Sequence, residues 1–165
     1  MKNKKTIWIV CGFVFLLLSG IVVGMNLNKW FSNPEAPVME VDDSSEEWTG
    51  NKETYTGKKN TDTIDIPGFG AINLKAGATE QAVNLYNPPQ NTCYFKMSLL
   101  LSDGTKLWES KLIAPGKAVY TITLNEVLNV GVYENATLKY DCFTMDEAQT
   151  PLNGSEIKLT LNVRE

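Results

Sequence analysis

Apolar and polar residues alternate with a period of two over much of this 165-residue chain from residue 62 onward. Successive side chains of a β-strand point to opposite faces of a sheet, so this alternation predicts strands with one buried and one solvated face. The four alternating runs cover residues 93–102, 118–124, 136–142 and 156–163. Shorter apolar runs at 71–74, 82–86 and 106–113 predict three further strands. The pattern predicts an all-β domain of seven strands.

Turn-forming residues separate these runs. Asn-Pro-Pro stands at 87–89, Asp-Gly at 103–104, Pro-Gly at 115–116 and Asn-Gly at 153–154, and such sequences favour tight turns. Short strands joined by hairpins in about 100 residues are typical of a sandwich of two sheets. No segment of this region has a helical apolar stripe, so we expect a seven-stranded sandwich over 62–165.

Several residues of this region resemble the immunoglobulin and fibronectin-type sandwich. Cys93, Trp108 and the run Tyr140-Asp141-Cys142 resemble the Cys, Trp and Tyr-x-Cys signature of that fold. Tyr133 resembles the tyrosine of the corner found in the same fold. The resemblance implies a core built around Trp108, Tyr133 and Tyr140. It concerns architecture and not membership of the antibody family, because the residues that usually precede Tyr-x-Cys are not in register.

The same resemblance implies that Cys93 and Cys142 lie opposite each other between the sheets and form a disulfide. Such a bridge would close a loop of about 50 residues and contribute on the order of 4 kcal/mol in the chain-entropy model. Two buried thiols that pack as small apolar groups are the alternative. A catalytic cysteine is the least favoured interpretation, because the chain has no histidine to activate a thiol.

The composition excludes several classes of function. The absence of histidine removes Ser-His-Asp and Cys-His catalysis and histidine-containing zinc sites. Fifteen Lys and Arg against nineteen Asp and Glu give a net charge of −4, so we expect no nucleic-acid partner. The acidic run at 42–47 lacks the glycine and final glutamate of a calcium-binding EF-hand loop. We therefore expect no enzyme, no cofactor and no metal site.

An uncharged apolar stretch from Ile7 to Met25 follows a start that contains Lys2, Lys4 and Lys5. A helix of this length reaches about 28 Å, close to the thickness of the hydrocarbon core of a bilayer. It exceeds a signal-peptide core, and no Ala-x-Ala cleavage site follows it, although a cleaved signal remains the alternative. The lysines predict a cytoplasmic N-terminus at 1–6, a transmembrane signal-anchor helix at 7–25, and an extracellular C-terminal domain. Gly12, Gly20 and Gly24 would share one face of that helix, which leaves open a weak homodimer.

Residues 26–61 hold two prolines, clustered charges and few apolar side chains. This composition predicts a disordered acidic linker that holds the domain at 62–165 away from the membrane. The single anchor and the Lys-rich, Asn-rich composition resemble those of small membrane-anchored proteins of Gram-positive bacteria. This resemblance implies a location in the cell membrane and no particular activity.

Two functions fit these expectations, and an enzyme that would have to act through carboxylates alone is a third, less favoured interpretation. The first is a membrane-tethered extracellular interaction module that binds another envelope protein through an edge strand or a cluster of loops. The second is a cell-wall or carbohydrate-binding domain, which would need aromatic side chains exposed as a stacking platform. Tyr86, Tyr94 and Phe143 are the candidate surface aromatics.

Overall fold

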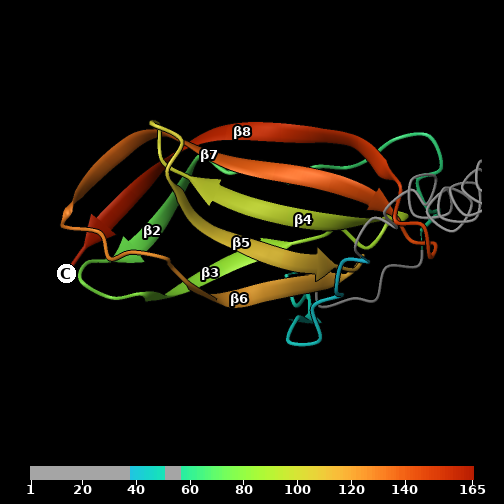
Figure 1. Cartoon of the computed structure of the whole chain (residues 1–165), viewed down its shortest axis with the longest axis horizontal. Helices are drawn as coiled ribbons and strands as arrows, with labels where there is room; N and C mark the ends of the chain where they lie inside the picture. Colours follow the sequence, from blue (N-terminus) through green and yellow to red (C-terminus); the bar gives the residue numbers. More distant parts are fainter. Residues whose placement is uncertain (1–37, 51–56) are drawn as a thin grey trace, which may run out of the picture. The chain divides into compact units, whose positions relative to one another are not determined.

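The computed structural model describes residues 38–50 and 57–165. The strands in these ranges are β1 (Glu46–Glu47), β2 (Ala71–Lys75), β3 (Glu80–Tyr86), β4 (Cys93–Leu100), β5 (Lys106–Ile113), β6 (Lys117–Thr123), β7 (Gly131–Thr144) and β8 (Pro151–Arg164). They form a five-stranded sheet in the order β2-β8-β7-β4-β5 and a three-stranded sheet in the order β1-β6-β3 (Figure 1). The all-β prediction is confirmed.

The described ranges contain no helix with the length and apolar character needed to cross a bilayer. The predicted signal-anchor helix at 7–25, with Gly12, Gly20 and Gly24, lies outside the described residues. So do residues 26–37 and 51–56 of the predicted linker.

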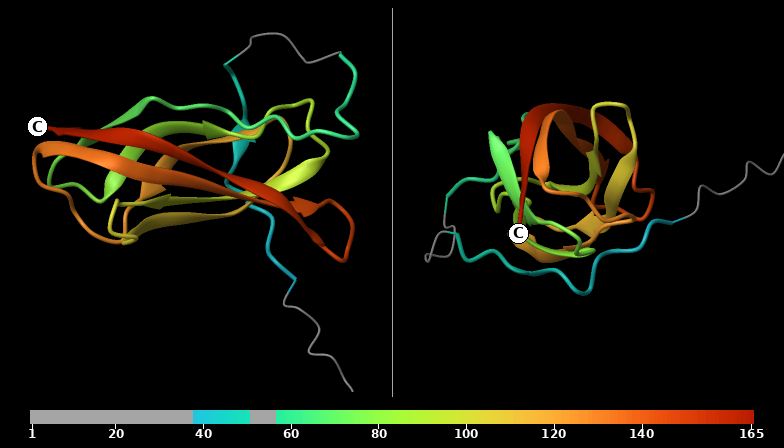
Figure 2. Two further views of the ribbon diagram at one scale, coloured as in Figure 1. Left: turned by 90° about the horizontal axis from the view of Figure 1, so that it is seen from above. Right: turned by 90° about the vertical axis from the view of Figure 1, so that its left-hand side faces the viewer.

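The seven strands expected from the alternation correspond to β2 through β8. β7 and β8 are longer than predicted and form an antiparallel hairpin that runs the length of the domain (Figure 2). Two irregularities interrupt its register, one between Tyr133 and Ala136 and one between Tyr140 and Cys142. Asn135 lies in the first with a φ of 57°, a left-handed conformation that asparagine tolerates better than most residues. Such bulges increase the local twist of a strand.

The core lies between the two sheets, and the alternation within β4 shows how the sequence defines it. Cys93, Phe95, Met97 and Leu99 are all at most 2% exposed. The ring of Phe95 meets that of Tyr140 edge to face, with centroids 5.3 Å apart. This arrangement is favoured for aromatic pairs.

Cys93 and Cys142 do not face each other across the two sheets. Cys93 lies on β4 and Cys142 on β7, which are neighbours in the five-stranded sheet. Cys93 is opposite Thr144, and Phe95 is opposite Cys142, so the cysteines are diagonal neighbours. The placement between sheets implied by the resemblance is therefore wrong, because the strand that carries Cys93 pairs directly with the strand that carries Cys142.

Residues 38–50, which we call the strap, pack on the sandwich although they fall within the predicted linker. β1 pairs antiparallel with β6, and Val41 forms a parallel bridge with Leu112 of β5. The side-chain amide of Gln149 accepts a hydrogen bond from the backbone nitrogen of Met39 and donates one to its carbonyl oxygen. The compact unit begins at Val38 and not at residue 62. Low hydrophobicity did not indicate this, because main-chain pairing needs few apolar side chains.

Candidate functional site: a slot between two sheet edges

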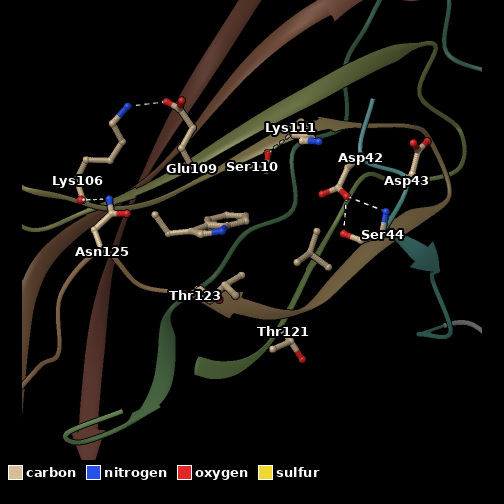
Figure 3. Close-up of a pocket in the computed structure, with 13 residues that line it drawn as sticks. Asp42, Asp43, Ser44, Lys106, Glu109, Ser110, Lys111, Thr121, Thr123 and Asn125 are labelled. Carbon is tan, nitrogen blue, oxygen red and sulfur yellow. Dashed lines mark hydrogen bonds and ion pairs between the residues drawn. The ribbon is translucent and has the colours of Figure 1, made fainter. Parts of the chain in front are cut away.

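The sandwich is open on one side, between β5 at the end of one sheet and β6 of the other. No strand ladder joins β5 to β6 in the part of the chain that the structure describes. The space between them, which we call the slot, has a volume of about 730 Å³. This volume falls within the range of ligand-binding pockets. Its walls include Trp108 and Ser110 from β5 and Thr121, Ile122 and Thr123 from β6 (Figure 3).

Both ends of the slot are closed. At one end lie Asp42, Asp43 and Ser44 of the strap (Figure 3). At the other end Asn125 joins the two sheets, because its backbone nitrogen donates to the carbonyl oxygen of Leu107 at 2.8 Å and its side-chain amide donates to that of Lys106 at 2.8 Å. The slot is therefore bounded at its two ends and open along its side.

The β6 edge presents backbone groups to the slot. The carbonyl oxygen of Lys117 accepts from Asn87 on the β3 side at 2.9 Å, whereas that of Gly116 accepts from Trp48 of the strap at 2.9 Å. Successive residues of a strand direct their backbone groups to opposite sides. Tyr120 and Ile122 consequently direct their N–H and C=O groups away from β3, toward the slot.

The β5 edge is less available for pairing. Its register against β4 is interrupted twice, between Lys96 and Ser98 and between Leu99 and Leu100. Ser110, which is 6% exposed, accepts a hydrogen bond from the Met97 nitrogen at 2.8 Å. Bulges and charged side chains are the usual means by which edge strands avoid pairing.

Charges on β5 are neutralised by their neighbours. Glu109 forms ion pairs with Lys96 at 3.0 Å and with Lys106 at 2.7 Å. The hydrogen bond from Lys106, together with the contribution of Lys96, outweighs partial burial and lowers the pKa of Glu109 to about 2. Lys111 pairs with Glu40 of the strap at 2.6 Å.

The strap end of the slot keeps an excess of negative charge. Residues 38–50 contain five carboxylates and no basic side chain. Glu40 and Glu47 pair with Lys111 and Lys117. Asp42, Asp43 and Glu46 form no ion pair with any residue in the described ranges, and Lys111 is close enough to Asp42 and Asp43 for both to help raise its pKa. An occupant that carries a cation at this end would complement that charge.

The residues that the resemblance places in the core have separate positions. Tyr140 is fully buried in the core, and its hydroxyl donates to the carbonyl oxygen of Pro67 at 3.2 Å. Trp108 is 8% exposed and contributes both to the core and to the wall of the slot. Tyr133 is half-buried, and its hydroxyl donates to the carbonyl oxygen of Asn129 at 3.1 Å. A bond from a tyrosine to the backbone a few residues upstream is the geometry of a tyrosine corner.

The candidate surface aromatics do not form one platform. Tyr86 is stacked against Trp48 of the strap, with ring centroids 4.0 Å apart and planes 8° apart, so one of its faces is covered. Tyr94 and Phe143 lie directly opposite each other on β4 and β7 and are half-buried. Only this second pair offers aromatic surface from neighbouring positions.

The two cysteines are free thiols that are 2% and 1% exposed. A hydrogen bond between them, together with burial, raises the pKa of Cys142. The same hydrogen bond lowers the pKa of Cys93, so what opposes nucleophilic reactivity in both thiols is their burial. Within residues 38–50 and 57–165, no group of three potential metal ligands comes together.

No protein-family model matches the chain, and no curated protein matches it either. The fold and the slot define an all-β protein with two sheets, in which the edge of β6 beyond its pairing with β1 faces the slot. Sequence patterns did not locate the slot, because they do not show which strands lie at sheet edges. The uncharged run at 118–124 is the one signal of an unprotected edge.

Proposed function

We propose that this protein is a membrane-tethered, extracellular and non-enzymatic interaction module that binds another envelope protein. The observation that carries the proposal is the uncovered β6 edge inside the slot. Sheet edges bind protein partners through main-chain hydrogen bonds, with side-chain pockets supplying specificity. An exposed edge without such a role is a liability, which proteins usually cover or charge.

We also propose that the sandwich is of the immunoglobulin-like type. Its supports are the order β2-β8-β7-β4-β5 over β6-β3, the parallel pairing of β2 with β8, and the bond from Tyr133 to Asn129. The positions of Cys93 and Trp108 are not among these supports. Cys93 shares a sheet with Cys142, and Trp108 lies on an edge strand.

The tether follows from the N-terminal sequence. The apolar stretch at 7–25 and the lysines before it favour a single-pass anchor in the cell membrane, with the sandwich outside the cell. Attachment to one membrane raises the effective concentration of the domain near other envelope proteins. Weak binding at the slot would then be sufficient.

A cell-wall or carbohydrate-binding function is the second candidate. Tyr94 and Phe143 favour it, because they lie side by side and keep part of their surface exposed. The stack of Trp48 on Tyr86 and the burial of Trp108 weaken it, since they remove two other aromatic surfaces.

Chemical crosslinking of the full-length protein in intact cells, followed by mass spectrometry of the captured material, tests the proposal. We expect one protein partner captured in a fixed ratio. Recovery of wall glycan alone would favour the second candidate. Recovery of the protein crosslinked only to itself would contradict both.

A further inference from the structure

We propose that the slot binds an extended polypeptide segment of about five residues, which pairs antiparallel with β6 and carries a lysine or arginine at its C-terminal end. This inference rests on the proposed function and specifies the chemistry of the partner. The supporting observations are the backbone of β6, the path of the strap, the two closed ends of the slot and the negative charge at its strap end.

The β6 backbone is suited to pair with a further strand. Between Val119 and Thr123 the strand has no charged residue, no proline and no bulge of its own, because the irregularity in its pairing falls between Ala82 and Leu85 of β3. Tyr120 and Ile122 direct their backbone groups into the slot, as argued above. A partner strand could therefore form a regular ladder with these two residues.

The chain already adds a strand to this edge. Glu46 and Glu47 of β1 lie opposite Ala118 and Lys117 in antiparallel register. If β1 began earlier in the chain and kept this register, its additional residues would pair with Val119 and then with Tyr120. It does not begin earlier, so the edge from Val119 onward is left uncovered.

A local turn just before β1 limits the strand at its N-terminal side. The Asp42 side chain accepts a hydrogen bond from the Ser44 nitrogen at 3.0 Å, and its carbonyl oxygen accepts one from the Ser45 nitrogen at 3.2 Å. Such turns are typical of aspartate. The turn takes the strap across to β5, where the Asp42 nitrogen donates to Leu112 at 2.8 Å. The strap therefore closes one end of the slot without filling it.

The two closed ends limit the size of the occupant. The five residues from Val119 to Thr123 span about 17 Å at the rise of an antiparallel strand. The strap closes one end of this length, and Asn125 closes the other. A short extended segment fits between these two ends. The longer edge strand of a second folded sheet would instead clash with the strap or with Asn125.

The charge at the strap end and the direction of the segment select its C-terminal residue. A segment antiparallel to β6 enters beside Thr123 and reaches Val119 with its C-terminal end. That end lies next to the strap, where the single cation Lys111 interacts with three carboxylates, Glu40, Asp42 and Asp43, so that negative charge remains in excess. A lysine or arginine at the last positions of the segment would therefore be selected, and an acidic residue there would be rejected.

The test is selection of a phage-displayed library of random linear nonapeptides on the full-length protein in lipid nanodiscs. We expect enriched peptides with alternating β-branched or aromatic residues followed by lysine or arginine. Binding should slow hydrogen exchange at the amides of Tyr120 and Ile122. Absence of enrichment over empty nanodiscs, or protection at another strand, would overturn the inference.

Matched variants locate the binding site. Thr121 and Thr123 are exposed on β6, and replacing both by lysine should weaken the selected peptides about tenfold or more, since edge lysines oppose strand addition. The control Asn84→Lys adds a lysine at an exposed position of β3 and should leave affinity unchanged. Asp43→Asn should reduce the preference for a C-terminal cation. Equal binding to the double variant and the control would place the site elsewhere.

The same variants separate this inference from the function on which it rests. If the full-length double variant still captures the protein partner in cells, the interaction module stands and the slot is not its site. If no partner is captured in cells, the proposed function fails whatever peptides bind to the slot. If the wild-type protein self-associates and the double variant does not, the occupant of the slot would be a second copy of the chain. That result would contradict the inference.

Discussion

The side-chain amide of Asn91 donates a 2.9 Å hydrogen bond to the side-chain oxygen of Asn87, and both residues are at most 1% exposed. The amide of Asn87 in turn donates to the carbonyl oxygens of Cys93 and Ile113, each at 2.9 Å. Asn91 also exchanges two hydrogen bonds with the backbone of Asp65. This buried network links β4, β5 and the segment before β2 near the strap end of the slot.

We expect Asn87→Ala to destabilise the protein by about 3 kcal/mol or more. The substitution removes the side-chain donor to two carbonyl oxygens and one of the two acceptors of the Asn91 amide, which keeps its bond to Asp65. Each buried hydrogen-bonding group that loses a partner costs about 1–3 kcal/mol. Denaturant unfolding followed by tryptophan fluorescence measures the loss. The control Asn84→Ala, at an exposed position of the preceding strand, should change the free energy of unfolding by less than about 0.5 kcal/mol. Similar effects of the two substitutions would show that the network does not hold these strands together.

Gly154→Ala should destabilise the long hairpin. A Cβ at position 154 would overlap the backbone carbonyl oxygen of Tyr140, and backbone atoms cannot rotate away. We expect a cost of about 1–3 kcal/mol, in line with overpacked sites elsewhere, visible as a lower Tm. Gly68→Ala is the matched control, because nothing lies within 4 Å of the Cβ that it would add. An unchanged Tm for Gly154→Ala would mean that β7 and β8 can separate there without cost.

Glu109 should make stability depend on acid pH. Its pKa is lowered to about 2, from an ordinary value of 4.5, chiefly by the hydrogen bond from Lys106. The ionised carboxylate therefore stabilises the fold fully above pH 4.5, and this contribution is lost as the pH falls from 4.5 toward 2. The free energy of unfolding of the wild type should fall relative to that of Glu109→Gln across this window, and less so at high salt. Parallel pH profiles would contradict the role of this ion-pair cluster.

Cys93 and Cys142 should remain reduced even outside the cell. The two thiols are hydrogen-bonded to each other, but diagonal neighbours on antiparallel strands typically lie about 7 to 8 Å apart. A disulfide requires less than about 7 Å between Cα atoms unless the backbone moves. Alkylation of the denatured protein without reductant, followed by peptide mass spectrometry, should modify both cysteines. Modification only after reduction would restore the disulfide implied by the resemblance.

Local patterns predicted the strands, because the alternation of Phe95 and Met97 with polar neighbours directly encodes one buried face. They did not predict which strands are neighbours. Pairing of β4 with β7 is a long-range choice that the sequence around Cys93 and Cys142 does not reveal. The sequence predicted a linker where the strap lies, because the strap is held by backbone hydrogen bonds, such as those of Leu112, and these leave no pattern in the side chains. The slot was missed because it lies between strands of different sheets, and local patterns do not show which strands are neighbours.

The most direct test of the account places a photocrosslinking amino acid at position 121 of the full-length protein in intact cells, and at position 84 for comparison. Thr121 lies in the wall of the slot, and Asn84 is exposed on the neighbouring strand. We expect position 121 alone to yield an adduct with one envelope protein, attached within a short extended segment that is followed by a basic residue. Adducts of equal yield at both positions, or adducts with wall glycan only, would contradict a protein-binding slot.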